Sequence, residues 1–275
     1  KLFDGGSDAV KLENPISSEM SHMRPDLLVG LLQAASRNQA RGFSDLALFE
    51  VGAAFHGGEP GEQHVQIAGL LVGATGPKDV HGARRDVDVF DAKADAEAVL
   101  SSIGAPAKVQ ILRDTPSWFH PGRSGKICLG PKKVLAQFGE VHPKTLKEMG
   151  VKGPAVAFTI FLEQPPFPRG GKVARPAFFT NDLQAVERDF AFVVDKSTAA
   201  LDLVNAAMGA DKALIEDVRV FDEFIGGSLG EDKKSLAITV RLQPANETLK
   251  EKDIEMVSAK IIAKVEKATK AVLRG

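Results

Sequence analysis

The 275-residue chain has 44% hydrophobic and 26% charged residues, which is typical of a folded protein with at least one sizeable core. Its formal net charge of −1 excludes a global attraction to nucleic acid or membrane, and its single cysteine excludes an internal disulfide and a multi-cysteine zinc site. The longest apolar runs, such as residues 155–162, are far too short to span a bilayer. We therefore expect a cytoplasmic protein without a membrane partner.

The first part of the chain predicts an antiparallel α+β sheet. Helices are expected at residues 25–41, after an N-cap at Asp91, and at residues 144–149. Strands are expected at residues 46–55, 65–72, 108–112, 126–129, 134–141 and 156–162. Turn-rich segments between neighbouring strands favour hairpins, and hairpins give antiparallel pairing.

Catalytic signals in this part are mostly negative. The sequence has no P-loop and no GxGxxG motif, and its six histidines form no local metal-binding pattern. Residues 118–124, the densest polar-aromatic cluster, fit either a binding loop or a structural turn, and Pro121-Gly122 favours the turn. Cys128 lies in an apolar strand, which indicates a buried and unreactive thiol. An enzyme with a distributed histidine site stays open as an alternative.

A linker rich in proline and glycine, residues 164–176, divides the chain, and we place the boundary near Phe178. Residues 1–177 are thus the first domain and residues 178–275 the second. Beyond the linker, strands are expected at residues 189–195, 215–225, 235–242 and 271–274. Helices are expected at residues 199–208 and after a capping box at residues 248–251. This βαββαβ order predicts a ferredoxin-like domain.

One hairpin of the second domain carries groups suited to RNA recognition. Asp222 can accept hydrogen bonds from a base edge, Phe224 can stack on an unpaired base, and Ser235 offers a hydroxyl. Three cations are candidate phosphate contacts: Lys233, Lys234 and Arg241. The same residues also fit an ordinary hairpin with a core phenylalanine and solvated charges.

Several motifs in a fixed order favour the RNA-binding interpretation over the ordinary hairpin. Residues 186–195, 220–226 and 233–237 together resemble the ferredoxin-fold anticodon-binding domain of phenylalanyl-tRNA synthetases. Upstream, four further segments are similar to landmarks of the catalytic-like module of the bacterial β subunit: residues 14–28, 48–52, 119–124 and 139–143. The resemblance covers nearly the whole chain.

The resemblance implies a C-terminal fragment of the β subunit of a bacterial (αβ)₂ phenylalanine–tRNA ligase. Its partners would be the α subunit, tRNA(Phe) and a second αβ heterodimer. The first domain would be a class II synthetase-like module without chemistry, because Leu48 stands where a working motif has an arginine two residues before Glu50. The fragment would therefore need no cofactor and be inactive alone, while ATP and Mg²⁺ would serve the whole enzyme, with ATP in the α subunit.

The resemblance also assigns base reading to Asp222, Phe224 and Ser235. The chain has 16 phenylalanines and no tyrosine, so Phe224 stands where the family often has a phenol. Strict strand alternation would put Asp222 and Phe224 on the buried face together with Val218 and Val220. We therefore predict a bulge near Phe221, or a strand that extends beyond its helical cover. The alternative from another class is a free-standing ferredoxin-like regulatory or protein-interaction module without a tRNA role.

Overall fold

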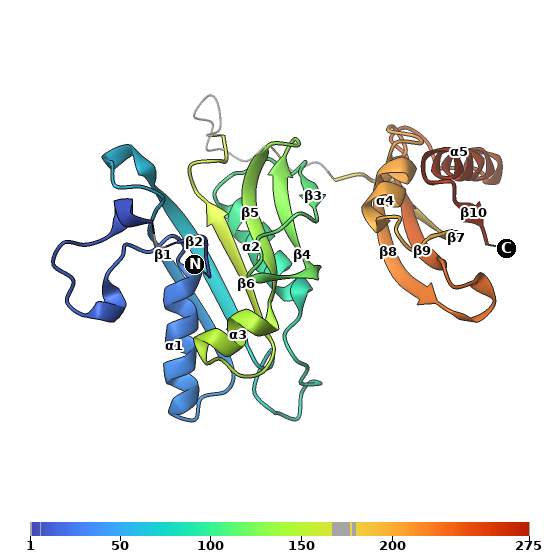
Figure 1. Cartoon of the computed structure of the whole chain (residues 1–275). Coiled ribbons are helices and arrows are strands. Elements are labelled where there is room, and N and C mark those ends of the chain that lie inside the picture. The colour runs from blue at the N-terminus through green and yellow to red at the C-terminus, as the bar shows by residue number, and fades with distance from the viewer. Residues whose placement is uncertain (1, 6, 167–176, 178–179, 275) are drawn as a thin grey trace. The chain divides into compact units, whose positions relative to one another are not determined.

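The computed structural model describes residues 2–5, 7–166, 177 and 180–274, which form two compact units (Figure 1). The predicted boundary near Phe178 and most of the predicted linker at residues 164–176 lie outside the described residues. Both units contain antiparallel sheets with helices, which confirms the α+β class. Within the described ranges, none of the helices combines the length and apolar character needed to cross a bilayer.

The first unit is built on a six-stranded antiparallel sheet in the order β1-β2-β6-β5-β4-β3. Its strands are β1 (Leu46–Phe55), β2 (Gln63–Val72), β3 (Gln110–Leu112), β4 (Phe119–Leu129), β5 (Lys133–Val141) and β6 (Ala155–Phe161). The central strand β6 is buried along nearly its whole length because helices cover both faces of the sheet. A strand covered on both faces reads as a continuous apolar run rather than an alternation.

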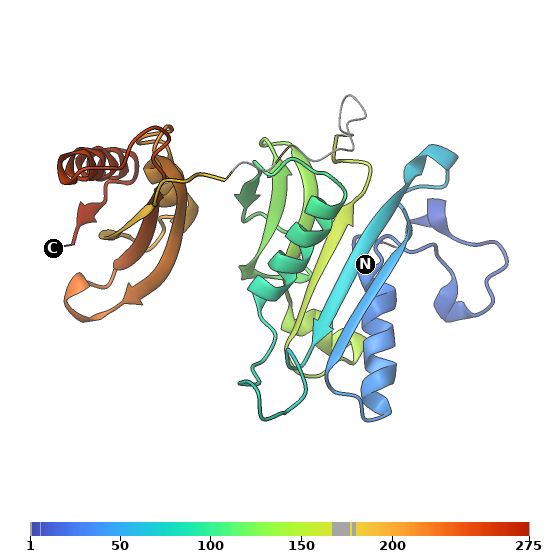
Figure 2. The same ribbon diagram turned by 180° about the vertical axis from the view of Figure 1, so that it is seen from behind.

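Three helices provide this cover. Helices α1 (Leu28–Ala40) and α3 (Pro143–Met149) pack on one face, and α2 (Val89–Ser102) packs on the other, which Figure 2 shows from behind. The apolar stripe of α1 buries Leu28, Leu31, Leu32 and Ala35, as the helical spacing predicts. Short 3₁₀ helices lie at Asp8–Val10, Ser18–Met20 and Pro60–Glu62 in this unit, and at Gly227–Leu229 in the second unit.

Two local predictions in this unit are wrong. The N-cap of α2 is Asp88, whereas Asp91 is the third helical residue and accepts from the Asp88 N–H at 2.8 Å. Residues 118–124 form no separate turn, because β4 begins at Phe119 and its register with β5 shifts between Phe119 and Ser124. This irregularity accommodates Pro121 within a strand, where a missing N–H is tolerated only at edges and bulges.

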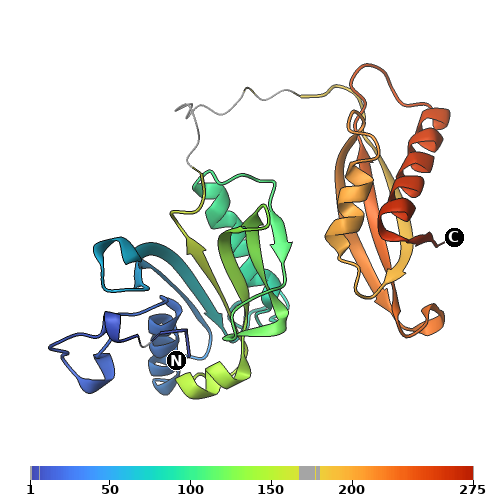
Figure 3. The same cartoon turned by 45° about the horizontal axis from the view of Figure 1, so that its top comes forward.

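In its described residues, the second unit contains a four-stranded sheet and two α-helices, shown in Figure 3. The strands are β7 (Val186–Asp195), β8 (Ile215–Ile225), β9 (Lys233–Leu242) and β10 (Val272–Leu273), and the helices are α4 (Ala200–Met208) and α5 (Glu251–Thr269). The antiparallel order β10-β7-β9-β8 confirms the ferredoxin-like topology.

The core of the second unit lies on one face of its sheet. Both helices contribute to it, with Leu203 from α4 and Ile261 from α5 packed against Phe192, Leu236 and Ile238. The predicted capping box at residues 248–251 is wrong: α5 begins at Glu251, and the Asp253 carboxylate accepts from the Lys250 N–H at 3.1 Å. Neighbouring acidic residues compete for the same cap, and the sequence alone does not rank them. The opposite face of the sheet lies away from the helices and holds the candidate site.

Candidate nucleic-acid interface

The geometry of the candidate site follows from a bulge in β8. Val220 pairs with Ile238, yet Asp222 pairs with the adjacent Ala237, so Phe221 is an extra residue in the ladder. An extra residue reverses the alternation of every side chain beyond it. Val218 and Val220 therefore lie on the helix-covered face, while Asp222 and Phe224 lie on the open face. The predicted bulge near Phe221 is confirmed.

Two cross-strand rows define the open face at this end of the sheet. Asp222, Ala237 and Ala191 form one row across β8, β9 and β7, and Phe224, Ser235 and Val193 form the next. Side chains directly opposite each other on neighbouring strands share a face and lie within contact range. The rows therefore bring a carboxylate, an aromatic ring and a hydroxyl together beside a floor of small residues.

The three predicted base-contacting residues differ in exposure. Asp222 is exposed and Phe224 is 44% exposed, so the phenylalanine ring is not covered by the helices. Ser235 lies on the open face, opposite Phe224, but it is only 4% exposed. Its neighbours on both strands bury it because β9 is an inner strand of the sheet. A base would reach this hydroxyl only after neighbouring side chains on the open face move.

The loop after β8 contains two glycines, and one of them lies beside the Phe224 ring. Gly226 and Gly227 adopt positive φ angles of 109° and 61°, which favour glycine. A β-carbon at Gly227 would also lie 3.4 Å from the ring of Phe224. A residue with a β-carbon there would be strained by the backbone conformation, although its contact with the ring would be an ordinary van der Waals contact.

The three predicted phosphate contacts are all engaged in ion pairs within the unit. Lys233 lies 2.6 Å from Asp195 and holds the pKa of that carboxyl below its usual range. Lys234 is buried and lies 3.1 Å from Glu223, and the Arg241 guanidinium lies 2.7 Å from Glu216. A phosphate would have to compete with these carboxylates. The role of the three cations stays a prediction.

Sequence reasoning missed one residue of this face, Arg274. Its N–H donates to the Ala191 carbonyl at 2.8 Å, and its guanidinium lies 5.8 Å from the centroid of the Phe224 ring. This distance is within the range of a cation–π interaction. No sequence signal could have found the contact, because 50 residues separate the two positions and only the pairing of β10 with β7 joins them.

Comparison with known proteins decides the family. Residues 1–162 match the family described as "Phenylalanyl tRNA synthetase beta chain CLM domain", and residues 182–274 match "Ferredoxin-fold anticodon binding domain". The chain belongs to the phenylalanyl-tRNA synthetase β-chain family. The resemblance inferred from the sequence motifs is thereby confirmed.

Curated members of the family match along the whole chain. A protein of Ruegeria pomeroyi named "Phenylalanine--tRNA ligase beta subunit" is 75% identical over 274 residues, and one of that name from Cereibacter sphaeroides is 67% identical over 279 residues. In each case the match covers 100% of this chain and 34% of the relative, so the chain spans about a third of their length. A solved pyrrolysyl-tRNA synthetase of Desulfitobacterium hafniense aligns with a TM-score of 0.40 at 16% identity, over 55% of this chain and 50% of the other. This last value is too low to establish a shared fold.

In the first unit of this synthetase β-chain family member, Glu50 is held by an internal ion pair. Arg24 Nη1 lies 2.5 Å from its carboxylate, and Arg24 Nε donates to the Ala53 carbonyl at 3.0 Å. A β-carbon at Gly52 would lie 2.6 Å from the same guanidinium. Leu48, two residues before Glu50, packs against the core beneath α1. The carboxylate therefore already has a cationic partner, and no second cation projects from β1 beside it.

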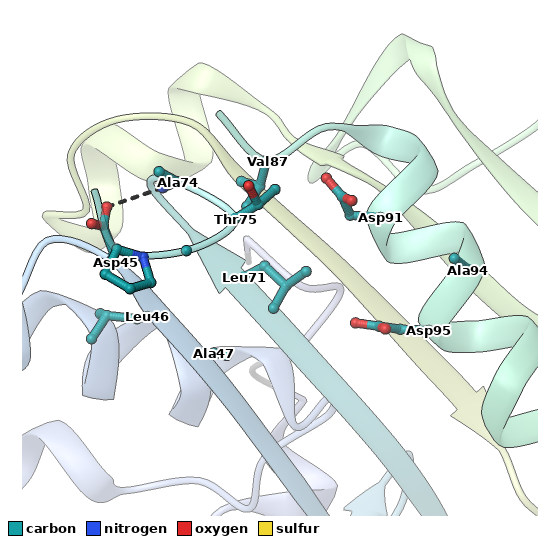
Figure 4. A pocket seen from close by; sticks show the side chains of 12 residues that line it. Asp45, Leu46, Ala47, Leu71, Ala74, Thr75, Val87, Asp91, Ala94 and Asp95 are labelled. Carbon is teal, nitrogen blue, oxygen red and sulfur yellow. Dashed lines mark hydrogen bonds between the residues drawn. The ribbon is translucent and has the colours of Figure 1, made fainter. Parts of the chain in front are cut away.

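The first unit also has a cavity of about 460 Å³ between the ends of β1 and β2, the following loop and α2 (Figure 4). Three carboxylates line it: Asp45, Asp91 and Asp95. Asp45 pairs with Arg84 at 2.7 Å and Asp91 pairs with Arg85 at 2.6 Å. Burial, together with the negative charge of Asp91, raises the pKa of Asp95. Such a lining disfavours the phosphates of a nucleotide.

The histidines and the single cysteine are the other candidates for chemistry in the first unit. Across the residues that the structure describes, no three His, Cys, Asp or Glu side chains come close enough to hold a metal ion. The rings of His56 and His64 stack with their centroids 4.3 Å apart. Burial of His64 and the neighbouring His56 lower the pKa of His64. Cys128 is buried as predicted, and burial raises the pKa of its thiol, which disfavours the reactive thiolate.

Proposed function

We propose that this chain is the non-catalytic C-terminal region of a bacterial phenylalanine–tRNA ligase β subunit that binds the anticodon of tRNA(Phe) in the cytoplasm. The observation that carries the proposal is the bulge at Phe221, which turns Asp222 and Phe224 onto the open face of a ferredoxin-like domain. Without the bulge, both side chains would lie on the opposite face of the strand, away from the row that contains Ser235. Membership of the synthetase β-chain family supports the same conclusion.

The chemistry of the site suits an unpaired guanine. The exposed ring of Phe224 offers a stacking surface for the first anticodon base. Asp222 accepts hydrogen bonds from the N1–H and N2–H₂ groups of the guanine edge, and Ser235 adds a hydroxyl contact once its cover opens. Lys233, Lys234 and Arg241 are weaker candidates for phosphate contacts, since each must first leave a carboxylate.

We also propose that the first unit is a class II synthetase-like module that supports the α subunit rather than performing adenylation. ATP recognition needs a free charged clamp, but Leu48 offers no charge and Glu50 is occupied by Arg24. The residues present therefore do not fit ATP, and the ATP and Mg²⁺ chemistry belongs to the α subunit. In the whole enzyme, the α subunit and a second αβ heterodimer complete an (αβ)₂ assembly.

A binding experiment tests the anticodon proposal. The chain should bind tRNA(Phe) more tightly than a transcript whose first anticodon base is changed from guanine to cytosine. Asp222→Ala should reduce this preference by about 5- to 150-fold, since a two-bond base contact is worth about 1–3 kcal/mol. Asp202→Ala, which removes an exposed carboxylate from α4, is the matched control and should leave the preference unchanged. Equal binding of both transcripts would favour the alternative protein-interaction module.

A second experiment tests the support role. The corresponding full-length β subunit should co-purify with the α subunit and give an aminoacylating complex. Glu50→Gln in that complex should change the aminoacylation rate by less than about twofold, because the residue is proposed to hold Arg24 rather than substrate. A loss of activity of about a hundredfold, with assembly intact, would assign chemistry to this module and overturn the proposal.

A further inference from the structure

Arg274 reaches the candidate site from the far edge of the sheet. Its N–H donates to the Ala191 carbonyl, which continues the pairing of β10 with β7 and places residue 274 in the row of Ala191, Ala237 and Asp222. Three strand spacings of about 4.8 Å separate the edges of this sheet, so β10 lies about 14 Å from β8. A guanidinium 5.8 Å from the Phe224 ring must therefore extend inward across the sheet.

Small residues make this path available. The two positions between Arg274 and Asp222 are Ala191 and Ala237, whose short side chains leave space above the sheet on the open face. A long side chain can lie along such a floor and keep its charged end exposed. Arg274 is exposed and, unlike the cations of β9, has no carboxylate within ion-pair distance among the residues that the structure describes.

We propose that Arg274 is a nucleotide-contacting residue that forms the second face of the stacking slot, opposite Phe224. The inference rests on the anticodon proposal and names a residue that the sequence motifs do not include. Guanidinium planes and aromatic rings both stack on unpaired bases. A base stacked between the Phe224 ring and the guanidinium, at about 3.4 Å from each, requires about 7 Å between them. The present distance is 5.8 Å, so the guanidinium must move away from the ring by roughly 1 Å to admit a base. Its flexible stem permits this movement, and the same movement uncovers the open face.

Four chains compared in one titration test the inference: wild type, Arg274→Ala, Arg274→Lys and the control Arg188→Ala. Arg188 is an exposed arginine of β7 on the opposite face, so its removal changes the net charge equally without touching the slot. Affinity for tRNA(Phe) is measured at several salt concentrations. Backbone amide exchange in β10 and β7 verifies that each variant keeps the edge pairing.

Arg274→Ala should weaken binding about tenfold and reduce the slope of log affinity against log salt by about 0.7, the value for one cation on a single strand. Arg274→Lys should restore the slope, because its charge remains, but stay about three- to tenfold weaker, because an ammonium cannot stack as a plane. Full recovery with lysine, or an alanine variant that matches the Arg188→Ala control, would overturn the slot.

The outcome separates this inference from the function on which it rests. If the Asp222→Ala variant loses the guanine preference while Arg274→Ala behaves like the control, the anticodon proposal stands and the role of Arg274 is wrong. If the wild-type chain shows no preference between the two transcripts, both proposals fail.

Discussion

The buried carboxyl of Asp26 should make the stability of the first unit depend on pH in an unusual direction. Asp26 is 5% exposed, and its Oδ1 accepts from the Leu28 N–H at 2.8 Å near the start of α1. Burial raises the pKa of Asp26 from 3.8 to about 6, although the bond from Leu28 works the other way. The folded unit therefore binds this proton more tightly than the unfolded chain does.

The sign and the size follow from this difference. The pKa of Asp26 is higher in the folded state than in the unfolded chain. Its stabilising contribution to the free energy of unfolding is therefore fully present below pH 3.8 and is lost as the pH rises through about 6. One pKa unit corresponds to 1.36 kcal/mol, so ionisation of Asp26 costs the folded state about 3 kcal/mol at pH 7.5. Asp26→Asn removes the charge and keeps an oxygen acceptor for Leu28. The variant should exceed the wild type by up to about 3 kcal/mol at pH 7.5, and the gap should close toward pH 4.

Urea denaturation of the whole chain at several values between pH 4 and 7.5, followed by tryptophan fluorescence, measures this gap. Trp118 is the sole tryptophan, is 7% exposed and lies in the same core as α1, so its signal reports on this unit. Asp91→Asn is a control of opposite sign. Arg85 lowers the pKa of Asp91 below 3.8, so the stabilising contribution of this carboxylate is nearly complete above that pH and is lost only at lower pH. The variant should therefore be less stable than the wild type by a nearly constant amount between pH 4 and 7.5. A stability gap for Asp26→Asn that does not vary with pH, or a loss of stability at pH 7.5, would refute the reasoning.

Three further predictions concern the site and the core. Phe224→Ala should weaken tRNA(Phe) binding by about 5- to 150-fold in a filter-binding assay, in line with about 1–3 kcal/mol for a base stacked on an aromatic side chain. Phe224→Tyr should bind at least as well as wild type, and equal affinities for all three chains would argue against stacking. Gly69→Ala should destabilise the first unit by about 1–3 kcal/mol in the Trp118 assay, because its β-carbon would collide with the Phe158 ring, and Phe158→Leu in the same chain should recover part of the loss. Cys128 should resist a thiol reagent in the folded chain and react once urea unfolds it, so rapid reaction under native conditions would contradict its burial.

Local pattern was sufficient for most of the secondary structure. Strands β1 and β8 begin and end at the predicted residues, because each is a long run rich in apolar residues that turn residues flank. The errors lie where neighbouring residues compete for one role. Both Asp88 and Asp91 can cap α2, and Pro121-Gly122 signals a turn although a register shift keeps it within β4.

The sequence by itself determined the family, the order of strands and helices, and the need for an irregularity near Phe221. The irregularity could be predicted because strict strand alternation places Asp222 and Phe224 on the buried face, whereas contact with a base requires the open face. Only the tertiary structure decided that an inner strand buries Ser235, that carboxylates hold Lys233, Lys234 and Arg241, and that Arg274 lies over Phe224. These features depend on which distant strands become neighbours, and the pairing of strands far apart in the chain leaves no periodic trace in the residues themselves.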